Sequence, residues 1–205
     1  MQNGIYFENA ALLPQGNAAY KLVAEETGAE ALFVSDETYK RYVAGFLTEG
    51  GFAVADKNGT TLFTDARYLE AAEKKLVPLG VNVETLSKEV KPELYLKRYK
   101  SVAVPYSEIS YAEFLSLQNC GAKFSDATNA IRECAKVKTE GELNAISRAC
   151  EIAEEGLQKT LGEIKEGMTE REVAAILEHE MRACGADGTS FDTIVAFGAG
   201  AAVPH

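Results

Sequence analysis

The sequence predicts an α/β fold with a mixed sheet, followed by a helical segment, and three observations support this. Strand-like and helix-like patterns alternate from about residue 19 to residue 126, as they do in layered α/β domains. The pair Asn58-Gly59 stands between two β-rich runs and predicts a tight hairpin, so at least one pair of strands is antiparallel. From Thr139 onward, two long amphipathic stretches follow each other without a strand between them.

Short runs of apolar, β-branched and aromatic residues predict the strands. The run ALFVS is suited to a buried strand, and the runs on either side of Asn58-Gly59 form the two arms of the hairpin. The run FDTIVAF is similarly rich in β-branched and aromatic residues. The predicted strands are 31–35, 52–55, 60–64, 81–86, 101–105 and 191–197, and the run 122–138 is expected to hold an exit strand and a connection.

Helices are expected where apolar residues recur every three or four positions between capping signals. A glycine stops the first of them at Gly28, and Ser110 with Glu113 forms a capping pair before another. The predicted helices of the first half are 19–26, 66–76, 93–98 and 111–119.

Two longer amphipathic helices are expected in the second half. Both open with the T-x-x-E pattern of a capping box, formed by Thr139 with Glu142 and by Thr169 with Glu172. Gly167 breaks the chain between them, so the two helices can fold back on each other.

The composition indicates a folded protein and excludes several functional classes. With 205 residues the chain is long enough for two modest domains, and the change of pattern near residue 128 places them at 1–128 and 129–205. The chain is 46% hydrophobic and 25% charged, and no stretch approaches the roughly 18 apolar residues of a membrane span. The net charge of -10, without any cluster of Lys and Arg, argues against nucleic acid and anionic membranes as partners.

The compartment is expected to be cytoplasmic. The first residues, MQNGIYFENAALLPQG, lack the basic start and long apolar stretch of a signal peptide. The four cysteines are widely spaced and form no C-x-x-C motif, so we expect buried free thiols rather than a metal or redox site.

Few residues carry an evident chemical signal. His179 lies between two glutamates on the polar side of its helix and is expected to be a solvated residue. Asp65 and Arg67 in FTDARY could form a ligand site, but the pattern favours an N-cap and its first helical turn. His205 could be an inert last residue, or it could hydrogen-bond a polarised carbonyl or move a proton where Pro204 holds it.

Longer motifs resemble a known family. The runs IRECAKVKTEGELNAISRACEIAEEGL and IKEGMTEREVAAILEHEMRACGADGTSFDTIVAFGAGAAVPH resemble the opening of the pita-bread (α+β) catalytic domain of metallopeptidases, in the aminopeptidase P and prolidase branch. The earlier run YKRYVAGFLTEGGFAVADKNGTTLFTDARYLEAA resembles the creatinase-type N-terminal domain of that branch, a mixed sheet with flanking helices.

The resemblance implies a proline-specific hydrolase, an Xaa-Pro aminopeptidase or dipeptidase that cleaves before a proline in the second position. It implies two divalent metal ions, Mn or Co, bridged by a hydroxide that forms from a water whose pKa the metals lower, and a glutamate base. The histidine of the family's PH motif corresponds to His205 and would bind substrate or stabilise the tetrahedral intermediate. A homodimer is also implied, since the N-terminal domain of this family commonly packs against the partner subunit.

The resemblance also implies that the chain is C-terminally truncated. The family's metal ligands, two aspartates, a histidine and two glutamates, follow the PH motif, so we expect that this chain binds no metal pair and is inactive by itself. Two alternatives stay open for the full-length protein: a creatinase-like hydrolase that works without metal, and a non-catalytic homologue that binds peptides or proteins.

Overall fold

The protein is described by a computed structural model that covers residues 13–203. It divides into two compact units, and the division falls between Lys138 and Thr139. This division lies after α6 (Thr128–Lys136), because that helix buries Ala130 and Ile131 in the core of the first unit. The domain limits 1–128 and 129–205 stay a prediction. No helix within residues 13–203 is both long enough and apolar enough to cross a membrane.

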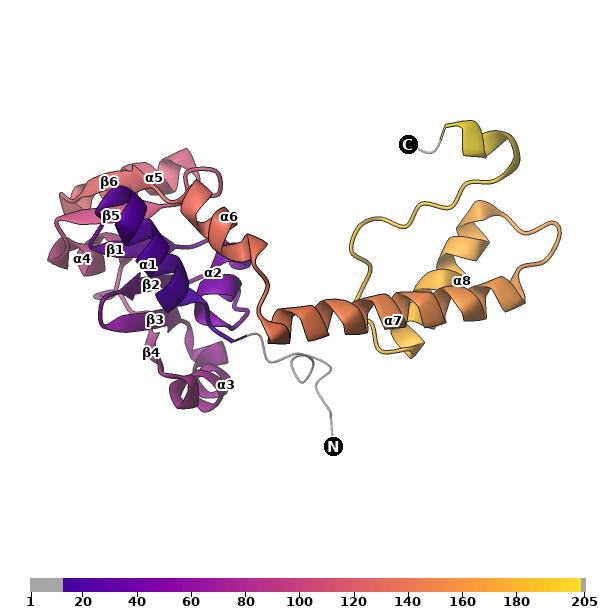
Figure 1. The fold of residues 1–205 in the computed structure, drawn as a ribbon, viewed down its shortest axis with the longest axis horizontal. Helices are drawn as coiled ribbons and strands as arrows, with labels where there is room; N and C mark the ends of the chain where they lie inside the picture. Colours follow the sequence, from indigo (N-terminus) through magenta and orange to yellow (C-terminus); the bar gives the residue numbers. More distant parts are fainter. Residues whose placement is uncertain (1–12, 204–205) are drawn as a thin grey trace. The chain divides into compact units, whose positions relative to one another are not determined.

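The first unit is built on a six-stranded mixed sheet in the order β4-β3-β2-β1-β5-β6 (Figure 1), which confirms the predicted fold class. β2 runs antiparallel to both of its neighbours, and the other neighbouring pairs are parallel. All strands except β2 therefore end at the same edge of the sheet. The strands are β1 (Ala31–Val34), β2 (Phe52–Asp56), β3 (Gly59–Thr64), β4 (Val81–Thr85), β5 (Ser101–Val104) and β6 (Lys123–Asp126).

Helices cover both faces of this sheet. One face packs against α1 (Gly16–Thr27), α2 (Glu37–Ala44), α3 (Ala66–Leu76) and α6. The other packs against α4 (Pro92–Tyr95), α5 (Tyr111–Leu117) and the short 3-10 helices η2 (Leu96–Arg98) and η3 (Gln118–Cys120), while η1 (Val77–Leu79) follows α3.

The central strand shows why both faces need cover. In β1, Leu32 and Val34 point into one core and Ala31 and Phe33 into the other, and all four side chains are fully buried. The prediction of a buried strand from the run ALFVS is therefore confirmed, because a strand buried on both faces reads as a continuous apolar run.

The second unit consists of α7 (Glu140–Glu163), α8 (Glu170–Ala183) and the 3-10 helix η4 (Gly198–Ala202). Both predicted capping boxes are present. The hydroxyl oxygens of Thr139 and Thr169 each accept a hydrogen bond from the amide of the third helical residue, and their own amides donate to the carboxylates of Glu142 and Glu172. The helices approach closely, since a Cβ on Gly156 would lie 3.0 Å from Cα of Met181.

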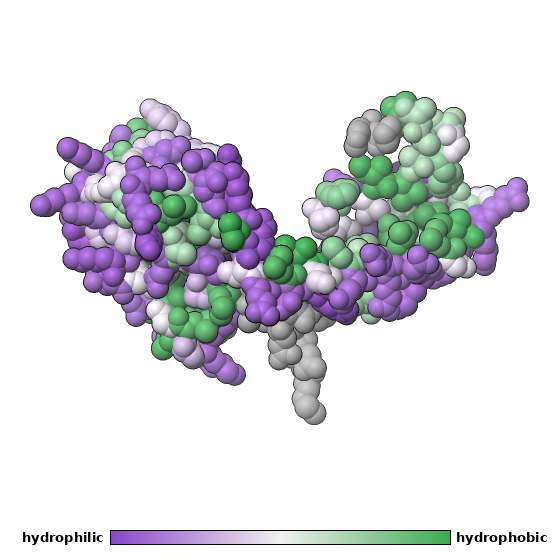
Figure 2. All heavy atoms as spheres, viewed as in Figure 1, coloured by the Kyte–Doolittle hydropathy of each residue, from purple (hydrophilic) through white to green (hydrophobic). Residues whose placement is uncertain are grey.

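Apolar side chains remain exposed in the second unit. Figure 2 shows hydrophobic residues gathered at the surface of α7 and of the segment after α8. The exposed apolar residues of α7 and its end are Leu143, Ile146, Leu157, Leu161 and Ile164. They belong to the stripe predicted from the spacing, so the amphipathic pattern is real but only partly covered within this unit.

Several local predictions are corrected by the structure. The run 191–197 is not a strand, since no strand among the described residues pairs with it and Phe191 is 71% exposed. Two helices were missed: α2, and α6 within the run 122–138. The predicted hairpin is confirmed, but its turn consists of Lys57 and Asn58, because Asp56 pairs directly with Gly59.

Candidate functional site

Several polar side chains of the first unit lie at one edge of the sheet, where β1, β3, β5 and β6 end; we call it the carboxyl edge. Asp36 follows β1, Asp65 follows β3, Tyr106 follows β5 and Asp126 ends β6, while the loop before β2 arrives at the same edge. In open α/β sheets, ligands bind outside the carboxyl ends of the strands. This edge is therefore where the first unit would present a site.

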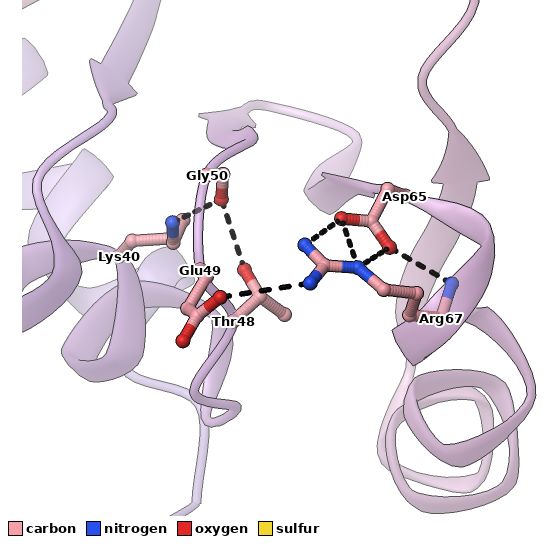
Figure 3. Close-up of polar contacts among 6 residues, drawn as sticks. All are labelled: Lys40, Thr48, Glu49, Gly50, Asp65 and Arg67. Atoms are coloured by element: carbon pink, nitrogen blue, oxygen red, sulfur yellow. Dashed lines mark hydrogen bonds and ion pairs between the residues drawn. The ribbon is translucent and has the colours of Figure 1, made fainter.

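Asp65 and Arg67 form a closed pair at this edge (Figure 3). Asp65 is the N-cap of α3, and its Oδ1 accepts a hydrogen bond of 2.8 Å from the backbone amide of Arg67. The guanidinium turns back onto the same carboxylate, with 2.7 Å between Nη2 and Oδ2 and 3.1 Å between Nε and Oδ1. The side-chain and backbone hydrogen bonds from Arg67 lower the pKa of Asp65. The predicted capping role of Asp65 is confirmed.

A second carboxylate approaches Arg67 from the loop before β2. Oε2 of Glu49 lies 3.7 Å from Nη1 of Arg67, and both side chains are largely exposed (Figure 3). Exposed pairs of this kind contribute little to stability, because water screens the two charges. Because two carboxylates flank one guanidinium, this cluster carries no excess positive charge that would hold an anion.

Two side chains donate hydrogen bonds to the same carbonyl oxygen in the loop that carries Glu49. Lys40 Nζ and Thr48 Oγ1 both donate hydrogen bonds to the carbonyl oxygen of Gly50, the latter at 3.1 Å (Figure 3). Gly51 has a φ of +73°, and a Cβ there would overlap the carbonyl oxygen of Phe63. The loop thus requires glycine at this position, because it runs directly along the backbone of β3.

Lys40 is the charged group that the sequence did not reveal. Its side chain is fully buried on α2, and burial lowers the pKa of its ammonium group, although the charges of Glu37, Asp36 and Glu113 oppose this shift. Its signal in the sequence is weak: an N-cap Asp36 followed by polar and apolar residues at helical spacing. A buried lysine cannot be distinguished from an exposed one in such a short helix without the loop that covers it.

Two buried polar atoms near this edge lack a hydrogen-bond partner within residues 13–203. They are Oδ2 of Asp36 and Oγ1 of Thr64. The other oxygen of Asp36 accepts a hydrogen bond of 2.9 Å from the amide of Tyr39, and burial raises the pKa of this carboxyl group. These atoms make the interior of the edge polar, but they do not form a metal site.

The described residues do not assemble the metal chemistry that the resemblance implies. Within residues 13–203, no group of three or more His, Cys, Asp or Glu side chains is placed to hold a metal ion. His205, the predicted substrate-binding residue, lies outside the described residues, as does Pro204. His179 is exposed, 3.9 Å from a carboxylate oxygen of Glu180, as expected for a solvated helix residue.

The four cysteines are free, as expected, and two of them contact a core: Cys134 packs against one core of the first unit and Cys120 against the other. Cys184 is half-buried and Cys150 is exposed. The expectation of burial fails for Cys150, because a position on the apolar side of a helix is buried only where another element covers that side.

Two consecutive segments of the chain match known protein families. The chain belongs to the Creatinase/Prolidase N-terminal domain family, which matches residues 20–136. Residues 144–205 match metallopeptidase family M24.

Individual relatives agree with this assignment. The chain is 29% identical to a Xaa-Pro dipeptidase of Pyrococcus horikoshii over 88% of this chain and 51% of the relative. Among solved structures, an X-Pro aminopeptidase from Thermotoga maritima is 30% identical with a TM-score of 0.80, covering 88% of this chain and 54% of that one. The prolidase from Pyrococcus furiosus is 27% identical with a TM-score of 0.81, covering 92% and 59%. The chain thus spans about half the length of the curated relatives it matches.

Proposed function

We propose that the whole protein to which this chain belongs hydrolyses the peptide bond between an N-terminal residue and proline. The observation that carries this proposal is the pair of consecutive family matches, a creatinase/prolidase N-terminal domain over 20–136 and metallopeptidase family M24 over 144–205. Relatives that match both parts are named Xaa-Pro dipeptidases and an X-Pro aminopeptidase. The substrate would be a dipeptide or longer peptide with proline in the second position.

The metal requirement belongs to this proposal. A pair of divalent ions, Mn or Co, would lower the pKa of a bridging water and polarise the scissile carbonyl. Because residues 13–203 contain no cluster that fits a metal ion, the ligands would have to come from outside them. We therefore propose that these 205 residues do not hydrolyse Xaa-Pro substrates by themselves.

We assign substrate binding to His205 on the resemblance of its PH motif, and this assignment rests on sequence alone. An imidazole titrates near neutral pH, so it can donate a hydrogen bond to a carbonyl oxygen on which charge develops. The homodimer and the cytoplasmic location likewise remain part of the proposal, and their support is the family resemblance and the cysteine usage.

The decisive experiment compares two chains on the dipeptide Ala-Pro with Mn²⁺ or Co²⁺. We expect metal-dependent release of alanine by the product of the complete coding sequence and none by residues 1–205. Turnover by residues 1–205 would refute the inactivity of this chain. Turnover by the complete product that survives exhaustive chelation would favour a creatinase-like hydrolase, and binding of peptides without turnover would favour a non-catalytic homologue.

The role of His205 is tested in the complete product. His205→Ala should lower kcat/KM for Ala-Pro by about 10²–10³, the usual loss when one transition-state donor is removed, with bound metal unchanged. The matched control is His179→Ala, which removes an exposed imidazole on α8 and should leave kcat/KM unchanged. Equal activity of the two variants would refute the assignment.

A further inference from the structure

The first unit carries an open cavity beside the end of β5. Its volume is about 370 Å³, and Tyr106, Ile109, Tyr111 and Phe114 line it. All four belong to one segment that follows β5 and enters α5. This volume lies within the roughly 300–1,000 Å³ range of pockets that bind small molecules.

The lining rings are held in a fixed arrangement. The rings of Tyr106 and Phe114 meet edge to face, with 5.3 Å between their centroids and an angle of 74° between their planes. Phe114 is held in the same way by Phe124 of β6, at 5.3 Å and 72°. The planes of the Tyr106 and Phe114 rings are nearly perpendicular, and Tyr111, 76% exposed, is the third aromatic side chain of the lining.

Hydrogen bonds fix the backbone that carries these rings. The carbonyl oxygen of Pro105 accepts the amides of Glu108 at 3.0 Å and Ile109 at 3.2 Å. The amide of Tyr106 donates to Oδ1 of Asp126 at 3.1 Å. The cavity is therefore built by an ordered turn, so a ligand would not have to order the loop first.

Carboxylates lie in and beside the lining segment, and the one tied directly to a lining residue is Asp126. Glu108 and Glu113 lie in the lining segment, and Asp126 is bonded to the amide of Tyr106. None of these carboxylates forms an ion pair within the described part of the chain. The charge of Lys40 is felt by Glu113 and that of Arg132 by Asp126, but the ammonium group of Lys40 is buried. Aromatic faces and unpaired carboxylates together favour a cation.

We propose that this aromatic cavity binds a small organic ammonium ion, a molecule whose positive nitrogen carries methyl or methylene groups. The aliphatic groups would contact Ile109 and the rings, and the charge would lie over the ring faces of Tyr106, Tyr111 and Phe114 near the carboxylates of the segment. None of its lining residues belongs to the segment that matches metallopeptidase family M24.

The test uses a charged ligand and its neutral analogue of the same shape. The 205-residue chain is titrated with choline and with 3,3-dimethylbutan-1-ol, and binding is followed through the tyrosine ring protons by NMR. We expect saturable binding of choline with a Kd of about 1–10 mM and binding of the alcohol that is about tenfold weaker. Equal binding of the two ligands, or no saturable binding of choline, would overturn the proposal.

Variants locate the site. Tyr111→Leu keeps an apolar side chain but removes the ring, and it should weaken choline binding at least about threefold. Phe191→Leu is the matched control, since it removes a ring that is 71% exposed outside the cavity. Glu113→Gln should weaken choline but not the alcohol. Unchanged choline affinity in Tyr111→Leu, with circular dichroism showing an intact fold, would refute the assignment to this cavity.

Discussion

The fully buried side chain of Lys40 donates a hydrogen bond from its Nζ to the carbonyl oxygen of Gly50, and this contact ties α2 to the loop before β2. Thr48 donates to the same oxygen, so the loop is held from two sides. The contact leads to the first prediction, because a buried ammonium group is both a strong donor and a source of desolvation cost.

Lys40→Met should lower the free energy of unfolding at pH 7 by about 1.5–3 kcal/mol, the usual contribution of a hydrogen bond from a charged donor. The folded pKa of Lys40 lies below its ordinary value of 10.5, so the protonated side chain destabilises the folded wild-type protein at low pH. This destabilisation disappears as pH rises from the folded pKa toward 10.5, because the group then loses its proton. In urea unfolding, the difference in free energy of unfolding between wild type and Lys40→Met should therefore increase from pH 7 to pH 10.5. A gap that narrows over this range would contradict the buried, desolvated state of Lys40.

Gly51→Ala should destabilise the first unit more than Gly50→Ala. Both glycines have a positive φ, +73° and +67°, so each alanine costs about 1–2 kcal/mol for the left-handed conformation. Only at Gly51 would the new Cβ also overlap the carbonyl oxygen of Phe63, which adds about 1–3 kcal/mol, whereas nothing lies within 4 Å at Gly50. Urea unfolding of the two variants measures this difference directly, and equal losses would count against the close approach.

Asp65→Ala should measurably lower the free energy of unfolding, because it removes the N-cap of α3. Arg67→Ala should cost less, because the cap remains and only the exposed ion pairs with Asp65 and Glu49 are lost. The pKa of Asp65 is lowered in the folded state, so its stabilisation is present above about pH 4 and is lost as pH falls through the folded pKa. Unfolding curves at pH 7 and pH 2.5 test both points, and a larger loss in Arg67→Ala would argue against capping as the main role.

Alanine substitutions at two glycines of α7 should change the stability of the second unit in opposite directions. At Gly162 no atom lies within 4 Å of the new Cβ, so Gly162→Ala should stabilise the helix by about 0.5–1 kcal/mol. At Gly156 the Cβ would lie 2.8 Å from Cγ of Met181 and 3.0 Å from its Cα, so the contact between α7 and α8 must open. Thermal unfolding should show a higher Tm for Gly162→Ala and a lower one for Gly156→Ala; a gain at both positions would mean that the helices do not touch there.

The local signals in the sequence predicted much of the fold. The capping boxes at Thr139 and Thr169 and the N-cap at Asp65 are read directly, because a cap is formed by residues within four positions of each other. Ser110 is a partial case, since its hydroxyl accepts the amide of Glu113 at 3.2 Å without the reciprocal bond of a full capping box. The family resemblance also came from sequence, because its motifs are continuous runs.

Tertiary structure decided what depends on contact between distant segments. The run 191–197 has the composition of a strand, yet a strand exists only where a neighbour supplies hydrogen bonds, and none among the described residues does so. Cys150 lies on an apolar stripe but is exposed, because burial requires a second element over the stripe.

The carboxyl edge of the sheet contains both features that neighbouring residues determine and contacts between distant segments. The sequence determined by itself that Asp65 caps a helix and that glycines precede β2, since these are properties of neighbouring residues. Only the folded chain placed Gly50 over Lys40 and joined the segment after β5 to Asp126 at the end of β6. The burial of Lys40 and the shape of the aromatic cavity follow from which segments meet in space, and that pairing is fixed by the order of the strands in the sheet.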